Sequence, residues 1–522
     1  MKTNIIWLFI VMLFSSGVFA QHEPKDSILL NESPFYIVFK QKLWEAPVVI
    51  QELPLQNFTQ TSIFAKYDKL NFKRTQTAEQ TTIVGFNTNG IYKTKNNILL
   101  FGDIVAEKSF EKNLSYNLTS ERSNNRMLLS PNYYFSPKKG DWENQHYRLK
   151  GGISTKIFQK FSVAAIVYYN TEKFFRKIDP RPEIKLLNYG GNIQFGYQYQ
   201  KHTLYSNFGL GKKTQEVDIA YVNKDLADPV SVLLFSIGYG RVIKDPSPDG
   251  GNSSDPGENV YYIQNDEKYG FGYNYALENG FINISYNYEK NLENLHNTNN
   301  KTREGERLVQ YRVISHKYNA MFFTQKDAKK YTITTDFQTS TGDNYSFVSP
   351  NGQNFKQEAQ KFSLFGEILK EEKAIAKYHL KTGFVYNTFK ASDFLAQVHK
   401  KIDAISFIIS GDKDFQFTEK TIGNIGLHGT FYQPIEETLL VPNNLNDFIE
   451  NVVLPDQNFD ASSKLKLGID LTYKIKLENK KTLQIFSSIS NVLIIDEETK
   501  YGENTATNNN NLFINGGITL NY

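Results

Sequence analysis

One stretch of alternating side chains near the end of the chain constrains the fold more than any other feature. From Leu465 to Leu477, every odd-numbered residue is apolar and every even-numbered residue is polar or glycine. Successive side chains of a β-strand point to opposite faces, so this pattern predicts a strand with one apolar and one polar face. Strands of soluble proteins have about five or six residues, whereas a strand that crosses a bilayer needs about 9–11. The stretch is therefore long enough to cross a membrane.

The last residues of the chain repeat this pattern. Ile514 to Tyr522 alternates again and ends on an aromatic residue. Together, the two segments predict an all-β fold, a transmembrane antiparallel β-barrel. We expect Ile518, Leu520 and Tyr522 to act as the assembly signal that the barrel assembly machinery reads.

The start of the chain reads as a secretory signal peptide over residues 1–20. Lys2 supplies a positive charge, Ile5 to Phe14 is a short apolar core, and Val18-Phe19-Ala20 is a small-residue cleavage site. The alternative is a transmembrane helix, but the apolar core is about half of the roughly 20 residues that a helical span needs. No cysteine follows the core, so a lipoprotein is not expected.

The composition fits a barrel whose strands meet lipid on one face only. The hydrophobic fraction is 40% and the mean hydropathy is −0.47, too low for a helical membrane protein. The 32 tyrosines and 39 phenylalanines fit the aromatic girdles of a barrel. A large soluble β protein is the alternative. The net charge of +4 gives no indication of nucleic-acid binding, and the lack of cysteine excludes disulfides and thiolate chemistry.

Two kinds of connection alternate along residues 58–522, the predicted barrel. Short turns such as Thr94 to Asn97 alternate with long connections such as Phe174 to Leu187 and Gly342 to Glu358. Short periplasmic turns and long external loops are typical of outer-membrane barrels. This count predicts about 18 strands, with 16 as the alternative. The apolar run from Val230 to Val242 is either an ordered loop element or an extra strand.

Residues 21–57 precede the barrel as a polar, irregular segment with four prolines. We expect this segment to lie in the periplasm or to tuck into the barrel, where it would block the lumen. It is too short to be the plug domain of a TonB-dependent receptor.

Charged residues on the polar faces of the predicted strands are expected to line the lumen. A charge facing lipid near the midplane costs about 2–4 kcal/mol, whereas a lumen charge tunes what passes or binds. The lumen-facing candidates are Lys466, Asp470, Lys474, Asp336 and Glu289.

Motifs of catalysis and metal binding are scarce. The eight histidines show no metal-ligand spacing, and neither a G-x-S-x-G elbow nor an HExxH motif occurs. A phospholipase barrel would need a serine beside a histidine such as His428, and none aligns with it. The segment at 245–258 is rich in the oxygen ligands that calcium prefers but fails the EF-hand pattern, so we expect a flexible external loop, with calcium binding as the alternative. We therefore predict a protein that is not an enzyme, with no catalytic, metal or cofactor site.

The signal peptide, the short prologue and the Asn/Tyr/Phe/Lys-rich strands resemble those of outer-membrane barrels of Bacteroidota. The chain is similar to an uncharacterised family that occurs beside TonB-dependent receptors and surface lipoproteins. The resemblance implies those partners, an outer-membrane location and a role in nutrient uptake.

Three functions remain open at this point. The first is a channel for small hydrophilic solutes, because an 18-stranded barrel is wide enough for an aqueous lumen. The second is a non-conducting receptor or accessory barrel that works with a TonB-dependent system through its long loops. The third is an enzyme on the lipid face.

Overall fold

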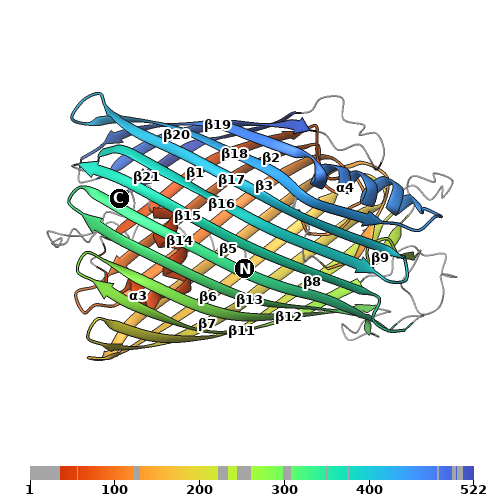
Figure 1. The fold of residues 1–522 in the computed structure, drawn as a ribbon, viewed down its shortest axis with the longest axis horizontal. Coiled ribbons are helices and arrows are strands. Elements are labelled where there is room, and N and C mark those ends of the chain that lie inside the picture. The colour runs from red at the N-terminus through yellow and green to blue at the C-terminus, as the bar shows by residue number, and fades with distance from the viewer. Residues whose placement is uncertain are drawn as a thin grey trace, which may run out of the picture.

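The chain folds into a closed antiparallel β-barrel, as the computed structural model shows (Figure 1). The structure describes residues 36–53, 55, 57–122, 130–221, 233–243, 260–297, 307–347, 351–372, 375–478, 481–496, 501 and 510–522. The predicted signal peptide and the oxygen-rich loop at 245–258 lie outside these residues.

Eighteen strands form the barrel, which confirms the predicted fold class and strand count. They are β1 (Phe58–Leu70), β2 (Gln80–Lys93), β3 (Leu99–Leu114), β5 (Gly140–Phe158), β6 (Phe161–Arg176), β7 (Arg181–Tyr199), β8 (His202–Ala220), β11 (Val260–Leu277), β12 (Gly280–Asn297), β13 (Arg307–Lys326), β14 (Lys329–Ser346), β15 (Phe355–Glu372), β16 (Ile375–Asp393), β17 (Val398–Gln416), β18 (Thr421–Leu440), β19 (Ser463–Lys476), β20 (Thr482–Asp496) and β21 (Asn510–Asn521).

Pairing of the first and last strands closes the barrel. Ser62 of β1 lies opposite Thr519 of β21. The backbone N–H groups of Thr59 and Tyr522 each donate to the other residue's carbonyl, at 2.7 and 2.9 Å. Closure leaves no unpaired strand edge in lipid, where each unsatisfied backbone group costs several kcal/mol.

The strands alternate between an outer apolar face and an inner polar face. On β19, Leu467, Ile469 and Leu471 are each about half exposed on the outer wall, at 51%, 51% and 50%. In a bilayer these side chains contact lipid, as the alternation predicts. The fold is therefore a transmembrane barrel, with charged side chains kept to the interior and to the two ends.

The barrel is taller than a membrane is thick. β13 and β18 have 20 residues each, about twice the length that a tilted spanning strand needs. Far from the short turns, the outer face carries exposed ion pairs such as Lys173–Glu183 at 2.8 Å and Arg312–Asp343 at 2.7 Å. This part of the wall projects beyond the lipid. We call it the long-loop end, and we call the opposite end, where the short turns lie, the short-turn end.

This projection explains why several predicted loops were too long. Residues 174–187 were predicted to form one connection, but β6 ends at Arg176 and β7 begins at Arg181. Residues 342–358 likewise belong mostly to β14 and β15. Outside the membrane the outer face is polar, so the apolar alternation stops while the strand continues.

Three further elements lie at the long-loop end. A small sheet pairs β4 (Asn132–Phe135) with β9 (Leu234–Ile237), and β9 with β10 (Val242–Ile243). The described part of the apolar run at 230–242 therefore belongs to this separate sheet and adds no barrel strand. The helices η3 (Ile449–Val453) and α4 (Leu454–Ala461) lie between β18 and β19.

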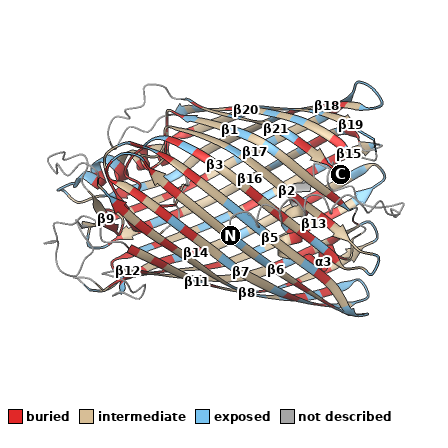
Figure 2. Cartoon of the chain, turned by 180° about the vertical axis from the view of Figure 1, so that it is seen from behind, coloured by how far each residue is buried: buried red, intermediate tan, exposed pale blue. Residues whose placement is uncertain are grey.

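The predicted irregular segment before the barrel contains two helices, α2 (Tyr36–Glu45) and α3 (Pro47–Ile50). Figure 1 shows them inside the barrel wall near the short-turn end. Among the described residues, no helix is long and apolar enough to cross a membrane. Figure 2 shows buried residues gathered around α3 and at the end that carries β9, with less buried wall between them.

Candidate functional site

The interior of the barrel is the candidate site, and at the short-turn end α2 fills it with apolar side chains. Phe39 packs edge-on against Phe323 with ring centroids 5.2 Å apart, and it also contacts Phe281 at 6.3 Å. Both partners are inward-facing residues of the barrel wall, and all three rings are almost fully buried. Trp44 lies edge-on to Phe101 of β3 at 4.8 Å. The helix is therefore packed against strands on several sides of the lumen.

Two lysines of α2 bind the wall through polar contacts. Lys42 is buried and donates to Asn283 at 3.2 Å and also to Asn319. Lys40 forms an ion pair with the buried Asp103 at 2.8 Å. Hydrogen bonds to charged groups are worth about 1.5–3 kcal/mol each, so these contacts add materially to the apolar packing.

The short helix α3 is attached to the same end of the barrel. The Gln51 amide donates to the carbonyl of Asn97 in a short turn at 2.6 Å. Its side-chain oxygen accepts from Ser154 at 2.6 Å, and Glu52 pairs with Lys156 at 2.8 Å. The N-terminal segment therefore enters the lumen at the short-turn end.

Beyond α2, one wall of the lumen carries a three-membered ion network. Glu289, a predicted lumen residue, lies between Lys268 at 3.1 Å and Lys317 at 2.7 Å. Asp336, another predicted lumen residue, accepts from Asn319, which also accepts from Lys42 of α2. Adjacent strands bring these side chains together on the face opposite the exposed Ile284 and Ile333.

Farther round the wall, histidines on β16 and β18 pair with carboxylates on β15, β17 and β19. His379 lies 2.7 Å from Asp412 and 3.6 Å from Glu367. His428 lies 2.9 Å from Asp470, another predicted lumen residue. His428 thus lies on the interior side, away from the lipid face that a phospholipase site would need.

The two other predicted lumen residues lie on the same face of β19 as Asp470. The Lys466 ammonium is 5.2 Å from the centre of the Phe513 ring. Lys474 is partly exposed and lies near the short-turn end of β19. Among the described residues, no group of three or more His, Asp or Glu side chains could hold a metal ion.

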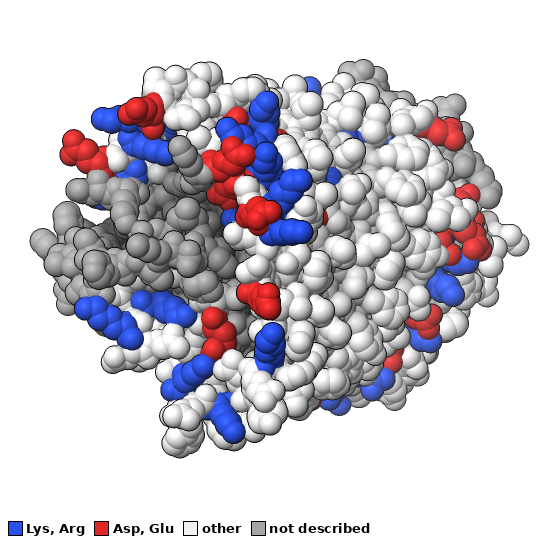
Figure 3. All heavy atoms as spheres, turned by 60° about the vertical axis from the view of Figure 1, so that its left-hand side comes forward, with Lys and Arg blue, Asp and Glu red and all other residues white. Residues whose placement is uncertain are grey.

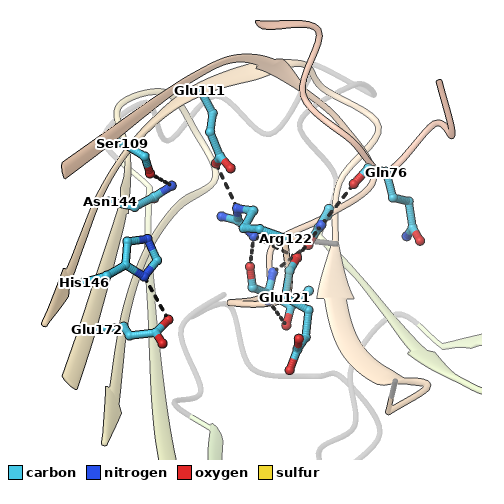
Figure 4. Close-up of polar contacts among 10 residues, drawn as sticks. Gln76, Ser109, Glu111, Glu121, Arg122, Asn144, His146 and Glu172 are labelled. Atoms are coloured by element: carbon cyan, nitrogen blue, oxygen red, sulfur yellow. Dashed lines mark hydrogen bonds and ion pairs between the residues drawn. The ribbon is translucent and has the colours of Figure 1, made fainter. Parts of the chain in front are cut away.

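At the long-loop end, the segment 115–122 turns inward and binds the wall, as Figure 4 shows. Arg122 pairs with Glu111 at 2.8 Å, and its guanidinium lies 4.5 Å from the Trp142 ring centre and 5.0 Å from that of Phe174. The neighbouring Glu121 pairs with Lys213 at 3.1 Å. No local sequence pattern indicates this arrangement, because its partners come from four separate segments.

Polar pairs continue along the same wall (Figure 4). Asn144 donates to Ser109 at 3.1 Å, and His146 lies 3.1 Å from Glu172. These residues have inward positions on β3, β5 and β6. The wall between the two filled ends is thus lined by hydrogen-bonding and charged groups of both signs.

A buried ion cluster holds α4 against the wall at the long-loop end. Asp460 of α4 pairs with Arg74 and with Lys400, the latter at 2.5 Å. Although burial opposes its ionisation, the charges of Arg74 and Lys400 lower the pKa of Asp460 to about 2. Burial raises the pKa of Asp456, which accepts from the backbone N–H of Thr75 at 2.8 Å. A cavity of about 80 Å³ lies beside these residues.

These features define a class: a transmembrane β-barrel with a polar, charged interior and segments of its own chain inside both ends. The chain belongs to DUF6850, a family of unknown function, whose model matches residues 47–522. No curated protein matches the chain.

Several solved outer-membrane proteins share the barrel fold at low similarity. The ferric preacinetobactin receptor BauA from Acinetobacter baumannii is 8% identical, with a TM-score of 0.39; the match covers 90% of this chain and 80% of that chain. The outer-membrane transporter YddB from Escherichia coli is 7% identical, with a TM-score of 0.38 and coverages of 90% and 81%. The TodX monoaromatic hydrocarbon channel is 8% identical, with a TM-score of 0.30 and coverages of 92% and 93%. Similarity at this level carries no argument about a ligand.

Proposed function

We propose that the protein is an outer-membrane channel for small hydrophilic solutes, closed at rest by its N-terminal helices. The observation that carries this proposal is the polar, mixed-charge interior of an 18-stranded barrel with α2 packed into one end. Eighteen strands enclose a lumen too wide for wall side chains alone to fill. The short turns face the periplasm in such barrels, so α2 and α3 would close the periplasmic side.

The charged side chains that line the lumen favour weak ion selectivity. The network of Lys268, Glu289 and Lys317 and the pair of His428 with Asp470 mix cationic and anionic groups. Figure 3 shows charges of both signs around the short-turn end as well. Strong selectivity requires rings of one sign, so we expect cations and anions to pass at similar rates.

Single-channel recording in planar bilayers tests the proposal. We expect rare openings from the wild-type protein. Replacing Lys40 and Lys42 together by Met removes the polar contacts of α2 and should increase the opening frequency. Deleting residues 21–54 should give larger current steps. Lys185→Met is a matched control, because Lys185 lies on the exposed outer face in an ion pair with Asp218 at 3.4 Å.

If the wild type, the lysine variant and the deletion all show no current steps, the channel proposal is overturned. That outcome would favour the second candidate, a receptor or accessory barrel whose loops bind a partner such as a TonB-dependent receptor or a surface lipoprotein. The observation that favours this alternative is the inserted material at the long-loop end, where β4 and β9 form a separate sheet and Lys400 binds α4 through Asp460. Neither candidate assigns a catalytic residue to the chain.

A further inference from the structure

The outer wall carries an apolar groove of about 880 Å³ near the short-turn end. It crosses strands β6 to β8 and β11 to β15 on the face that contacts lipid. Phe195, Leu204 and Phe271 line it, each 58–63% exposed in the absence of lipid. Leu204 is the third residue of β8, so the groove opens close to the turn that begins this strand.

The strand register explains why this part of the wall is hollow. One row of outward residues runs Phe195, Ser206, Phe271 and Tyr286 across β7, β8, β11 and β12. Ser206 is the small member of this aromatic row. The neighbouring row lies closer to the short-turn end, and in it Ala320 is the small residue beside Ile284. Small residues between large ones leave two notches in the wall.

Ring contacts fix the sides of the groove. The ring centroids of Phe271 and Tyr286 lie 5.2 Å apart, those of Tyr286 and Tyr318 lie 5.0 Å apart, and those of Tyr318 and Phe337 lie 5.9 Å apart. Aromatic pairs at these separations are worth about 0.5–1.5 kcal/mol beyond area burial. The groove is thus bounded by a continuous aromatic ridge.

Cationic and hydrogen-bonding groups stand at the mouth of the groove. Lys160 directly precedes the lining residue Phe161, and its ammonium is 5.6 Å from the Tyr199 ring centre. Lys201 lies in the turn before β8, and His202 begins the strand. His202 Nδ1 lies 2.7 Å from the hydroxyl of the lining residue Tyr273. Among the described residues, neither Lys160 nor Lys201 forms an ion pair, so both are available to a ligand.

From this juxtaposition we infer a binding site for one phospholipid. Its acyl chains lie in the notches at Ser206 and Ala320, and its phosphate contacts Lys160, Lys201 and His202. The inference rests on the membrane orientation in the proposed function, which puts the short-turn end in the inner leaflet of the outer membrane, where phospholipids lie. Cationic groups at an aromatic-walled groove complement an anionic phosphate above two apolar tails.

Another groove on the outer wall provides an internal control. It has a similar volume, about 860 Å³, and its lining is mainly leucine, isoleucine and glycine. Ser487 lines it and faces outward between Leu471 and Gly516. A Ser487→Trp variant therefore changes the same residue type on the same surface without touching the aromatic groove.

Native mass spectrometry of the full-length mature barrel, delipidated in detergent and titrated with phosphatidylethanolamine, tests the site. We expect one tightly retained phospholipid per wild-type barrel. The double variant S206W/A320W fills both notches and should no longer retain this phospholipid. K160A/K201A keeps the groove and should bind about tenfold more weakly, as loss of a charge-assisted contact implies. S487W should match the wild type.

Each other outcome would overturn the inference. Equal lipid retention in all variants would mean nonspecific annular lipid. A dimer that S206W/A320W abolishes, with no bound lipid, would assign the groove to a second copy of the chain. If inorganic phosphate alone displaces the lipid, the cationic groups at the mouth of the groove would be a site for a free anion. If the tryptophan variant does not fold, the lipid affinity of K160A/K201A, whose substitutions lie in turns, tests the inference. Wild-type affinity of that variant would then overturn it. The lipid count does not depend on conductance, so a silent channel recording would leave this test intact.

Discussion

Replacing Leu471 by Arg should destabilise the barrel strongly, whereas the same change one residue later should not. Leu471 lies near the middle of β19, is half exposed on the outer wall, and has Ile425 and Ser487 as its register partners. An arginine facing lipid at the midplane costs about 2–4 kcal/mol. At 1.36 kcal/mol per factor of ten, this corresponds to about a 30- to 1000-fold shift toward the unfolded state.

Thr472 is the matched position, because it faces the interior beside the charged Asp470 and Lys474 of the same strand. Arginine there meets a polar, hydrated surface, so we expect a loss below about 1 kcal/mol. Both free energies of unfolding are measured by denaturant titration in lipid vesicles, with tryptophan fluorescence as the signal. Equal losses at the two positions would refute the assignment of the odd-numbered face of β19 to lipid.

Three further predictions test other parts of the chain. Cleavage after Ala20 should give a mature protein found in the outer-membrane fraction; a soluble periplasmic product would contradict the barrel in vivo. Deleting residues 516–522 removes the second half of β21, the strand that closes the barrel, and should abolish membrane insertion, whereas normal surface proteolysis of this variant would argue against an assembly role. The native pKa of Asp460 lies near 2, below its unfolded value of about 3.9. Its ionisation therefore stabilises the α4 contact by about 2–3 kcal/mol at pH above 5, and this contribution is lost as the pH falls toward 2. Pepsin cleavage within 441–462 should therefore rise between pH 4 and pH 2 more steeply in the wild type than in D460N, with an unfolded substrate cleaved in parallel to correct for the pH dependence of pepsin.

The wall of the barrel could be predicted from sequence because each strand carries its own signal. The alternation in β19 is local, and lipid contact on one face preserves it in every spanning segment. Where β6 and β7 extend beyond the lipid, that constraint ends, and polar residues on both faces hide the strand. The length of the barrel above the membrane therefore had no local signature.

The contacts inside the barrel could not be predicted, because they depend on strand register. Glu289 and Asp470 were placed in the lumen by alternation, but their partners Lys317 and His428 lie 28 and 42 residues away. The helix α2 was missed for a related reason. Its sequence, YIVFKQKLWE, is rich in aromatic and β-branched residues of modest helix propensity. Phe39 and Leu43 share one helix face, so the packing of that face in the lumen stabilises the helix.

The segments inserted at the two ends of the barrel differ in how firmly they bind the wall, and this difference predicts which end opens first. At the long-loop end, sixteen buried apolar residues from wall and inserted segments form one cluster, and nine more, including those of η3, form a second. At the short-turn end, the main cluster has fourteen buried apolar residues, and α2 contacts the wall through polar groups of Lys40, Lys42 and the Glu45 carbonyl. Fewer contacts must break to release α2 than to release the material at the mouth. We therefore expect the short-turn end to open first, and the K40M/K42M variant to conduct before any loop variant does.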